Sequence, residues 1–187
     1  MDRQDSGTEA SGLPVLPAAV TGILQGVPLM AIDWPLRRMV ASFARRHGSV
    51  FARLGPYATR RFLIDPLDLP FAFCLHPRAP APRIAVLRKP VSCRSDARIA
   101  GPLSALLGML HGMLDGDALF FSRDLVVEGD IEAVLALRNA LDDVDVDLAA
   151  EAMAALGPLA PPVAPLVRRT LLEASRLTGV ALTRPGR

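Results

Sequence analysis

The residue types that could perform chemistry are few in this chain, and they are scattered. The three histidines, His47, His76 and His111, fall in separate predicted elements without the spacing of metal ligands. Ser92 and Cys93 could supply a nucleophile, but no general base lies near them in the sequence. No G-x-S-x-G elbow, Walker loop, CxxC or G-x-G-x-x-G motif is present. We therefore expect no catalytic residue, no bound metal and no cofactor; a small lipid hydrolase or thioesterase using Ser92 or Cys93 is an alternative.

The acidic run Asp142-Asp-Val-Asp-Val-Asp147 could suggest a calcium site. It lacks the mid-loop glycine and the closing bidentate glutamate of an EF-hand loop. We interpret this run as a solvated acidic turn between two structural elements.

Charge is distributed unevenly along the 187 residues, although the net charge is only +2. The stretch from Arg37 to Arg61 holds seven arginines and no acid, whereas Asp115 to Glu151 is strongly acidic. This asymmetry predicts one face that meets a charged partner; solvated helix faces are the alternative. The arginines are not interleaved with aromatic residues, and Lys89 is the only lysine, so we expect no nucleic-acid partner.

The two cysteines, Cys74 and Cys93, each lie inside an apolar, strand-like run. Two cysteines are too few for a disulfide framework of the kind that stabilises secreted domains. We therefore predict buried, reduced thiols in a cytoplasmic protein.

The N-terminal region, residues 1–32, combines a polar tail with an apolar arm. From Leu13 to Ile32 there is no charge for twenty residues, a length that could span a bilayer. Three prolines and two glycines in this arm would interrupt a lone helix. We expect the arm to pack on the domain, and binding at a membrane interface or a true span are the alternatives.

A basic amphipathic helix is predicted from Asp33, with Pro35 in its first turn, to His47. Its apolar stripe includes Leu36, Met39 and Phe43. Such a helix can lie on an anionic membrane, which would make the protein peripheral at the inner membrane; more often it covers a sheet. The predicted membrane-contact residues are Arg37, Arg38, Arg45 and Arg46.

Five strands and two helices are predicted to follow. The strands are Arg60–Asp65, Phe71–His76, Arg83–Leu87, Val91–Ser95 and Leu125–Glu128. Asp96 is a candidate N-cap for a helix over Ala97–Leu110, and Asp130, after a Gly129 turn, for a helix ending near Leu141. In the C-terminal extension, residues 148–187, we predict a short helix followed by a longer one.

The chain is rich in apolar side chains on elements expected to meet at one face of a sheet. Ordinary core packing is the simpler interpretation for any one of them. The functional interpretation is that some of them line an apolar cavity for a lipid. The candidates are Phe43, Phe71, Phe73, Leu103, Leu107, Leu110, Met113, Phe120 and Phe121.

A sequence resemblance gives this pattern a more specific meaning. The segment Ala118-Leu-Phe-Phe-Ser-Arg-Asp-Leu-Val-Val-Glu-Gly-Asp-Ile-Glu132 resembles the UbiT-like ubiquinone-biosynthesis accessory factors, which have a lipid-binding domain of the sterol-carrier-protein type. Arg138-Asn139 and the basic segment Pro35–Met39 also fit. The resemblance covers about Leu29 to Asp147, which matches a domain over residues 33–147.

This resemblance implies an α+β fold with a five-stranded, mostly antiparallel sheet, covered by helices that enclose an apolar tunnel. It further implies a non-catalytic factor that binds isoprenoid quinone precursors and works alongside hydroxylases in oxygen-independent ubiquinone biosynthesis. Two alternatives remain open: a scaffold of a biosynthetic complex without a ligand, and a general phospholipid or sterol-type lipid carrier.

Overall fold

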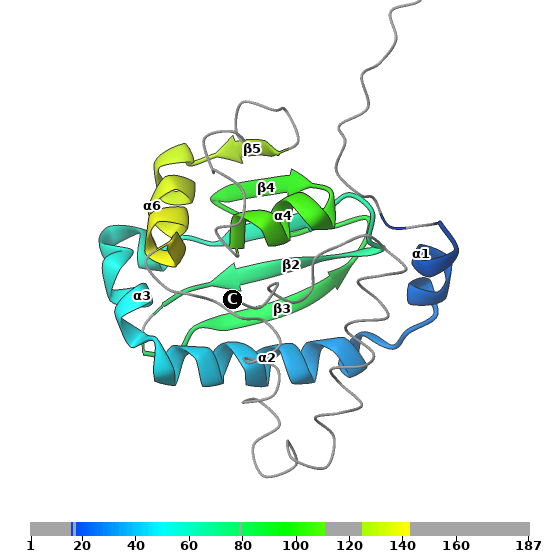
Figure 1. Ribbon diagram of the computed structural model, residues 1–187, viewed down its shortest axis with the longest axis horizontal. Helices are drawn as coiled ribbons and strands as arrows, with labels where there is room; N and C mark the ends of the chain where they lie inside the picture. Colours follow the sequence, from blue (N-terminus) through cyan, green and yellow to red (C-terminus); the bar gives the residue numbers. More distant parts are fainter. Residues whose placement is uncertain (1–15, 17, 79, 111–124, 143–187) are drawn as a thin grey trace, which may run out of the picture.

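The computed structural model describes residues 16, 18–78, 80–110 and 125–142 (Figure 1). The helices are α1 (Ala18–Gln25), α2 (Leu29–Arg46), α3 (Gly48–Arg53), the 3-10 helix η1 (Gly55–Thr59), α4 (Leu103–Leu110) and α6 (Ile131–Asp142). The strands are β1 (Phe62–Pro66), β2 (Phe71–His76), β3 (Arg83–Arg88), β4 (Ala97–Gly101) and β5 (Val126–Gly129).

The five strands form one sheet in the order β3-β2-β1-β4-β5. Every neighbouring pair is antiparallel except β1 and β4, which run parallel at the centre of the sheet. This arrangement confirms the predicted α+β fold with a five-stranded, mostly antiparallel sheet covered by helices.

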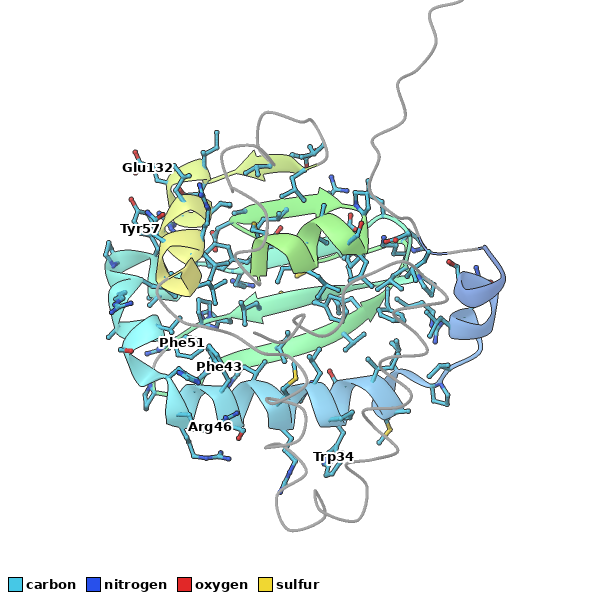
Figure 2. The ribbon with its side chains drawn as sticks, viewed as in Figure 1. Trp34, Phe43, Arg46, Phe51, Tyr57 and Glu132 are labelled. Carbon is cyan, nitrogen blue, oxygen red and sulfur yellow. The ribbon has the colours of Figure 1, made fainter. Side chains whose placement is uncertain are left out.

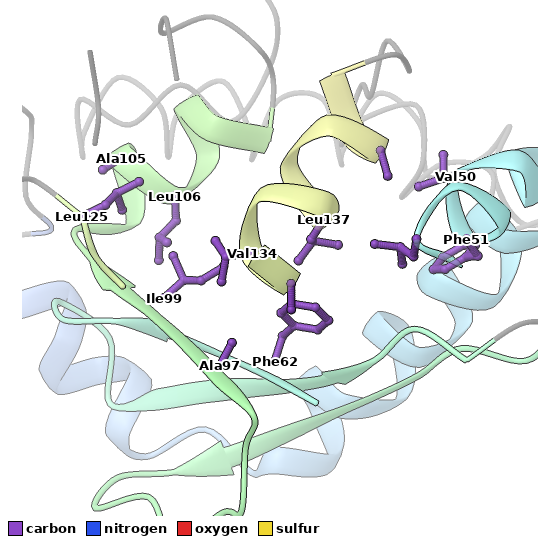
Figure 3. Packing of buried hydrophobic residues seen from close by; sticks show 13 residues of the cluster. Val50, Phe51, Phe62, Ala97, Ile99, Ala105, Leu106, Leu125, Val134 and Leu137 are labelled. Carbon is purple, nitrogen blue, oxygen red and sulfur yellow. The ribbon is translucent and has the colours of Figure 1, made fainter. Parts of the chain in front are cut away.

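The larger hydrophobic cluster, here the α6 cluster, lies between one face of the sheet and helices α3, α4 and α6 (Figure 3). Phe62 at its centre is fully buried. Burying a phenylalanine side chain contributes about 2–3 kcal/mol, so this layer is a major source of stability. The buried residues of the α6 cluster are Val50, Phe51, Leu54, Phe62, Ala97, Ile99, Ala105, Leu106, Leu125, Ala133, Val134, Leu137 and Ala140.

The smaller hydrophobic cluster, here the α1 cluster, consists of buried Leu69, Phe71 and Val86 with partly buried neighbours from the arm and α2. Asp68 strengthens this end of the molecule, because its carboxylate accepts hydrogen bonds from the backbone N–H of Leu16 (3.1 Å) and of Leu103 (2.9 Å). The described part of the apolar arm therefore packs on the domain. In the ranges that the structure describes, no helix combines the length and apolar character needed to cross a membrane.

Helix α2 runs along the outer side of β3, the edge strand of the sheet (Figure 1). The backbone N–H of Val86 donates a 3.0 Å hydrogen bond to the Asp33 carboxylate. An uncovered edge strand exposes unpaired backbone groups to other chains, so α2 protects this edge.

Helix α2 begins at Leu29, earlier than the predicted start at Asp33, and Pro35 lies inside it. Proline removes one backbone donor and usually breaks a helix. Here Leu29, Ile32 and Leu36 all pack against the α1 cluster, so tertiary packing carries the helix across the proline.

The predictions between Val91 and Leu110 were partly wrong. Val91–Ser95 is not a strand, the fourth strand is Ala97–Gly101, and the helix starts only at Leu103. Asp96 is not a helix cap: its carboxylate accepts a 2.7 Å hydrogen bond from the Arg61 N–H. The small residues of β4 become a strand because they pair in parallel with β1, which local propensity does not reveal.

The unit from β5 to α6 was predicted well. The Asp130 carboxylate accepts a 3.0 Å hydrogen bond from the Ala133 N–H, which is the expected N-cap contact. Tyr57 donates a 2.8 Å hydrogen bond to Glu132 and joins η1 to the start of α6 (Figure 2). The predicted acidic turn begins at Asp142, the last residue of α6; its remaining residues and the predicted C-terminal helices lie outside the described residues.

Candidate functional site

The helix-covered face of the sheet carries an unbroken apolar row across all five strands. Side chains alternate between the two faces of a strand, so residues in direct register share a face. Starting from β3, the row consists of Val86, Phe73, Ile64, Ile99 and Val127.

Coverage of this row is incomplete, both at Val127 on the edge strand β5 and at two neighbouring residues of β1 and β2. Val86 and Ile99 are buried, whereas Phe73 and Ile64 are only half-buried. Ile64 packs against the α6 cluster and its register partner Phe73 against the α1 cluster, so the boundary between the two clusters passes between them. Leu75 and Leu103 are also half-buried at the borders of these clusters. We call Ile64, Phe73, Leu75 and Leu103 the apolar seam.

The structure brings together three of the predicted lipid-binding residues. Phe71, Phe73 and Leu103 all belong to the α1 cluster, and the rings of Phe71 and Phe73 meet edge to face with centroids 5.7 Å apart. Phe71 is buried, with 5% of its surface exposed, so its visible role is packing, whereas Phe73 and Leu103 also lie in the seam.

The remaining predicted lipid-binding residues are placed differently. Phe43 packs against the α6 cluster, and its ring meets the Phe51 ring edge to face with centroids 6.1 Å apart. Leu107 is half-buried on α4. The side chain of Leu110, and Met113, Phe120 and Phe121 entirely, lie outside the described residues.

The outer face of α2 carries the predicted membrane-contact residues. Arg37, Arg38, Arg45 and Arg46 are all exposed. Figure 2 shows Arg46 and Trp34 on the side of the helix away from the sheet. Arg37 forms a 2.7 Å ion pair with Asp33, and the Arg38 guanidinium lies 5.9 Å from the Trp34 ring centroid.

The sequence interpretation missed two apolar residues on this face. Met30 is 83% exposed and Trp34 is 65% exposed, which is unusual for such large apolar side chains. The four-residue spacing of Met30, Trp34 and Arg38 places them on one helical stripe. That spacing was readable in the sequence, but the helix was expected to start after Met30.

The opposite face of the sheet has a charged centre instead of an apolar one. The buried Asp65 carboxylate lies 2.7 Å from the Lys89 ammonium and 2.5 Å from the Arg98 guanidinium. Burial alone would raise the pKa of Asp65, but Lys89 and Arg98 outweigh it and hold this pKa below its usual range. Arg98 also reaches Glu128 at 3.0 Å. This network is a structural element that ties β1, β4 and β5 together.

The described residues hold no group of three histidine, cysteine or acidic side chains that could bind a metal ion. Cys74 and Cys93 are half-buried, not buried as predicted, and their sulfur atoms are 3.2 Å apart. A hollow of about 210 Å³ lies at the β2–β3 turn. It is lined by His76, Arg78, Pro80, Ala81 and Arg83 and lies outside the apolar seam.

Part of the chain matches the model of a known protein family. The family model described as the SCP-2 sterol transfer family matches residues 53–142. No curated protein matches the chain.

The chain is similar to several solved structures. "UbiJ-SCP2 Ubiquinone synthesis protein" is 17% identical, with a TM-score of 0.49, covering 62% of this chain and 93% of that one. Sterol Carrier Protein 2 from Yarrowia lipolytica in its apo form is 12% identical, with a TM-score of 0.40, covering 57% of this chain and 87% of that one. Sterol Carrier Protein 2 Like 2 from Aedes aegypti is 17% identical, with a TM-score of 0.36, covering 58% and 97% respectively. The match to the SCP-2 sterol transfer family model, over residues 53–142, takes in all five strands of the sheet.

Proposed function

We propose that this protein is a non-catalytic, lipid-binding accessory factor of oxygen-independent ubiquinone biosynthesis, and that the apolar seam holds the isoprenoid tail of a quinone precursor. The observation that carries the lipid site is the incomplete cover of an otherwise apolar sheet face at Ile64, Phe73, Leu75 and Leu103. The pathway assignment is supported by the resemblance of Ala118–Glu132 to the UbiT-like factors.

The physical reason for such a site is the insolubility of the ligand. Removing each CH₂ group of an isoprenoid tail from water contributes about 0.8 kcal/mol. A half-buried row of aliphatic and aromatic side chains can supply that contact, while a polar ring stays at the site's mouth. There the ring is accessible to the hydroxylases, which are the partners we propose.

Extraction of the purified protein with organic solvent, followed by mass spectrometry, tests the lipid site directly. We expect an isoprenoid quinone precursor in the wild-type extract. In the Phe73→Ser variant, the lipid-to-protein ratio should fall about tenfold, because the variant loses a phenyl contact worth more than 1 kcal/mol.

A matched control separates binding from folding. Phe51 is buried in the α6 cluster and is not itself a seam residue, so Phe51→Leu should lower stability while leaving the lipid-to-protein ratio near that of the wild type. Equal lipid loss in both variants would contradict a site at the seam. A wild-type extract with only phospholipid or sterol would indicate a general carrier, and one without any lipid would favour the scaffold alternative.

The membrane that would supply the lipid is, in our proposal, met by the outer face of α2. Tryptophan is suited to the interface between headgroups and acyl chains, where Trp34 and Met30 would insert. The neighbouring arginines, Arg38 and Arg45 among them, would then face anionic headgroups, each contributing about 1 kcal/mol near the surface.

Trp34 is the only tryptophan in the chain, so its fluorescence reports this contact alone. Vesicles containing anionic phospholipid should shift its emission to the blue, and purely zwitterionic vesicles should do so much less. In a sedimentation assay Met30→Ser should weaken vesicle binding severalfold. Leu67→Ser is the control, because Leu67 is 59% exposed but lies in the β1–β2 turn. Unchanged emission, or equal binding to both kinds of vesicle, would rule out this docking surface without affecting the lipid-extraction result.

A further inference from the structure

Two thiols from distant parts of the chain meet on the face of the sheet opposite the helices. Cys74 lies on β2 between Phe73 and Leu75, which both pack on the helix side, so its own side chain points to the other face. Cys93 lies in the segment 89–96, which joins β3 to β4. The two sulfur atoms are 3.2 Å apart and both residues are half-buried.

The segment 89–96 is held at both ends by contacts that do not involve the thiols. At one end the Lys89 N–H donates to the Pro70 carbonyl at 3.0 Å, and the Lys89 ammonium pairs with Asp65 at 2.7 Å. At the other end the Asp96 carboxylate accepts from the Arg61 N–H at 2.7 Å. Cys93 is therefore held near Cys74 by the fold, and the sulfur atoms need to approach by only about 1 Å to reach the length of a disulfide bond.

We propose that Cys74 and Cys93 are a redox modification site, which closes to an intramolecular disulfide by exchange with a small disulfide such as oxidised glutathione. In the first step the Cys93 sulfur attacks glutathione disulfide, forming a mixed disulfide and releasing one glutathione. In the second step the Cys74 sulfur attacks Cys93 and releases the second glutathione. The two cysteine protons leave on the two released thiols, and the two electrons reduce the glutathione disulfide.

The surroundings of the two thiols set this order of attack. Burial, together with the close contact between the two sulfur atoms, raises the pKa of Cys74 to about 11, so Cys74 is a protonated thiol near neutral pH. Thiolates, not thiols, attack disulfides, which disfavours Cys74 as the first nucleophile. Once Cys93 is bound to glutathione, its sulfur can no longer carry a negative charge beside Cys74, and the nearby Arg61 charge favours the Cys74 thiolate.

Closing the bond would fasten the segment 89–96 to the strand beneath it. The cross-link would enclose residues 74–93, which include the β2–β3 turn and all of β3, and would restrict the unfolded chain, which is the main way in which disulfides stabilise proteins. This inference does not depend on the lipid site, because both thiols lie on the face away from the seam.

Equilibration of the full-length protein in glutathione buffers of increasing oxidised fraction, followed by acid quenching and mass spectrometry, tests the proposal. We expect an oxidised species lacking two hydrogen atoms per chain and carrying no glutathione. Trypsin separates the two cysteines, because it cuts after Arg61, Arg78, Arg88 and Arg94, so the bond should appear as a linked peptide pair. The oxidised form should melt about 5–10 °C higher than the reduced form.

Cys93→Ser and Cys74→Ser are the matched controls, since each leaves a single thiol in the chain. Neither variant should lose two hydrogen atoms, and neither melting temperature should change with the glutathione ratio. A stable glutathione adduct on wild-type Cys93, a disulfide between two chains, or resistance to oxidation across the whole series would each overturn the proposal.

Discussion

Replacing Gly129 with alanine should destabilise the domain by about 3 kcal/mol, because the backbone at this position leaves no space for a side chain. Gly129 has a φ of +85°, a conformation that residues with a Cβ rarely adopt. A Cβ there would overlap the Asp96 carbonyl oxygen and would lie 3.3 Å from the Ala97 Cα. The same carbonyl accepts a 2.9 Å hydrogen bond from the Asp130 N–H, so relief of the overlap would disturb the start of α6.

Substitutions at two other glycines separate the effect of the positive φ from the effect of the close contact. The free energy of unfolding of each variant can be measured in urea. Gly55 also has a positive φ, +51°, but a Cβ there would meet nothing within 4 Å, so Gly55→Ala should cost only about 1 kcal/mol. Gly48 lies in helix α3 with open space around it, so Gly48→Ala should leave stability unchanged or slightly improved. If Gly129→Ala costs no more than Gly55→Ala, the close approach to Asp96 is not what makes glycine necessary.

Replacing Asp65 with asparagine should cost about 2 kcal/mol at neutral pH. The substitution leaves two positive groups, Lys89 and Arg98, without their shared carboxylate in a largely buried site. Loss of one partner from a fully buried ion pair typically costs about 3–5 kcal/mol. Here Lys89 and Arg98 are 26% and 31% exposed, so water and Glu128 compensate in part.

The pH dependence gives this prediction a second readout. The pKa of Asp65 is lowered in the folded protein, so its contribution is fully present above the usual value of 3.8. That contribution is lost as the pH falls below 3.8 through the folded-state pKa. The stability difference between the wild type and Asp65→Asn should therefore be constant above about pH 5 and shrink in more acidic solution.

Glu128→Gln is the control for this experiment. It removes the more exposed partner of Arg98, and an exposed ion pair typically contributes less than about 1 kcal/mol. A loss as large as that of Asp65→Asn would show that the exposed end of the network is the important one. If the stability difference between the wild type and Asp65→Asn stays unchanged down to about pH 3, the pKa of Asp65 is not lowered in the folded protein.

The sequence predicted those parts of the fold that depend on local signals. The bounds of β2 agree with the prediction because its apolar and polar faces alternate regularly, and the Gly129-Asp130 pair marked both the end of β5 and the cap of α6. The strand β4 was missed because Ala97–Gly101 has no strong strand propensity. Its conformation depends on pairing with β1, which begins 35 residues earlier in the chain.

In the candidate site, too, the features that depend on local sequence were predicted and those that depend on long-range packing were not. Strand alternation was enough to group Phe71 with Phe73, and both lie on the helix-covered face as expected. The seam itself was not predictable, because partial burial of Ile64 beside Phe73 results from how two separate clusters meet. Met30 and Trp34 were missed because a proline was taken to start a helix that in fact continues through it.

The parallel pairing at the centre of the sheet means that the domain cannot be divided into smaller folding units. Strands β1 to β3 are adjacent along the chain and can form a local meander. In that meander the side of β1 that pairs with β4 in the complete sheet would have no partner strand. Only β4 closes that edge, and β4 in turn receives β5 and the helix that follows. Fragments that end before Ala97 should therefore remain incomplete, and the described domain should unfold as one cooperative unit.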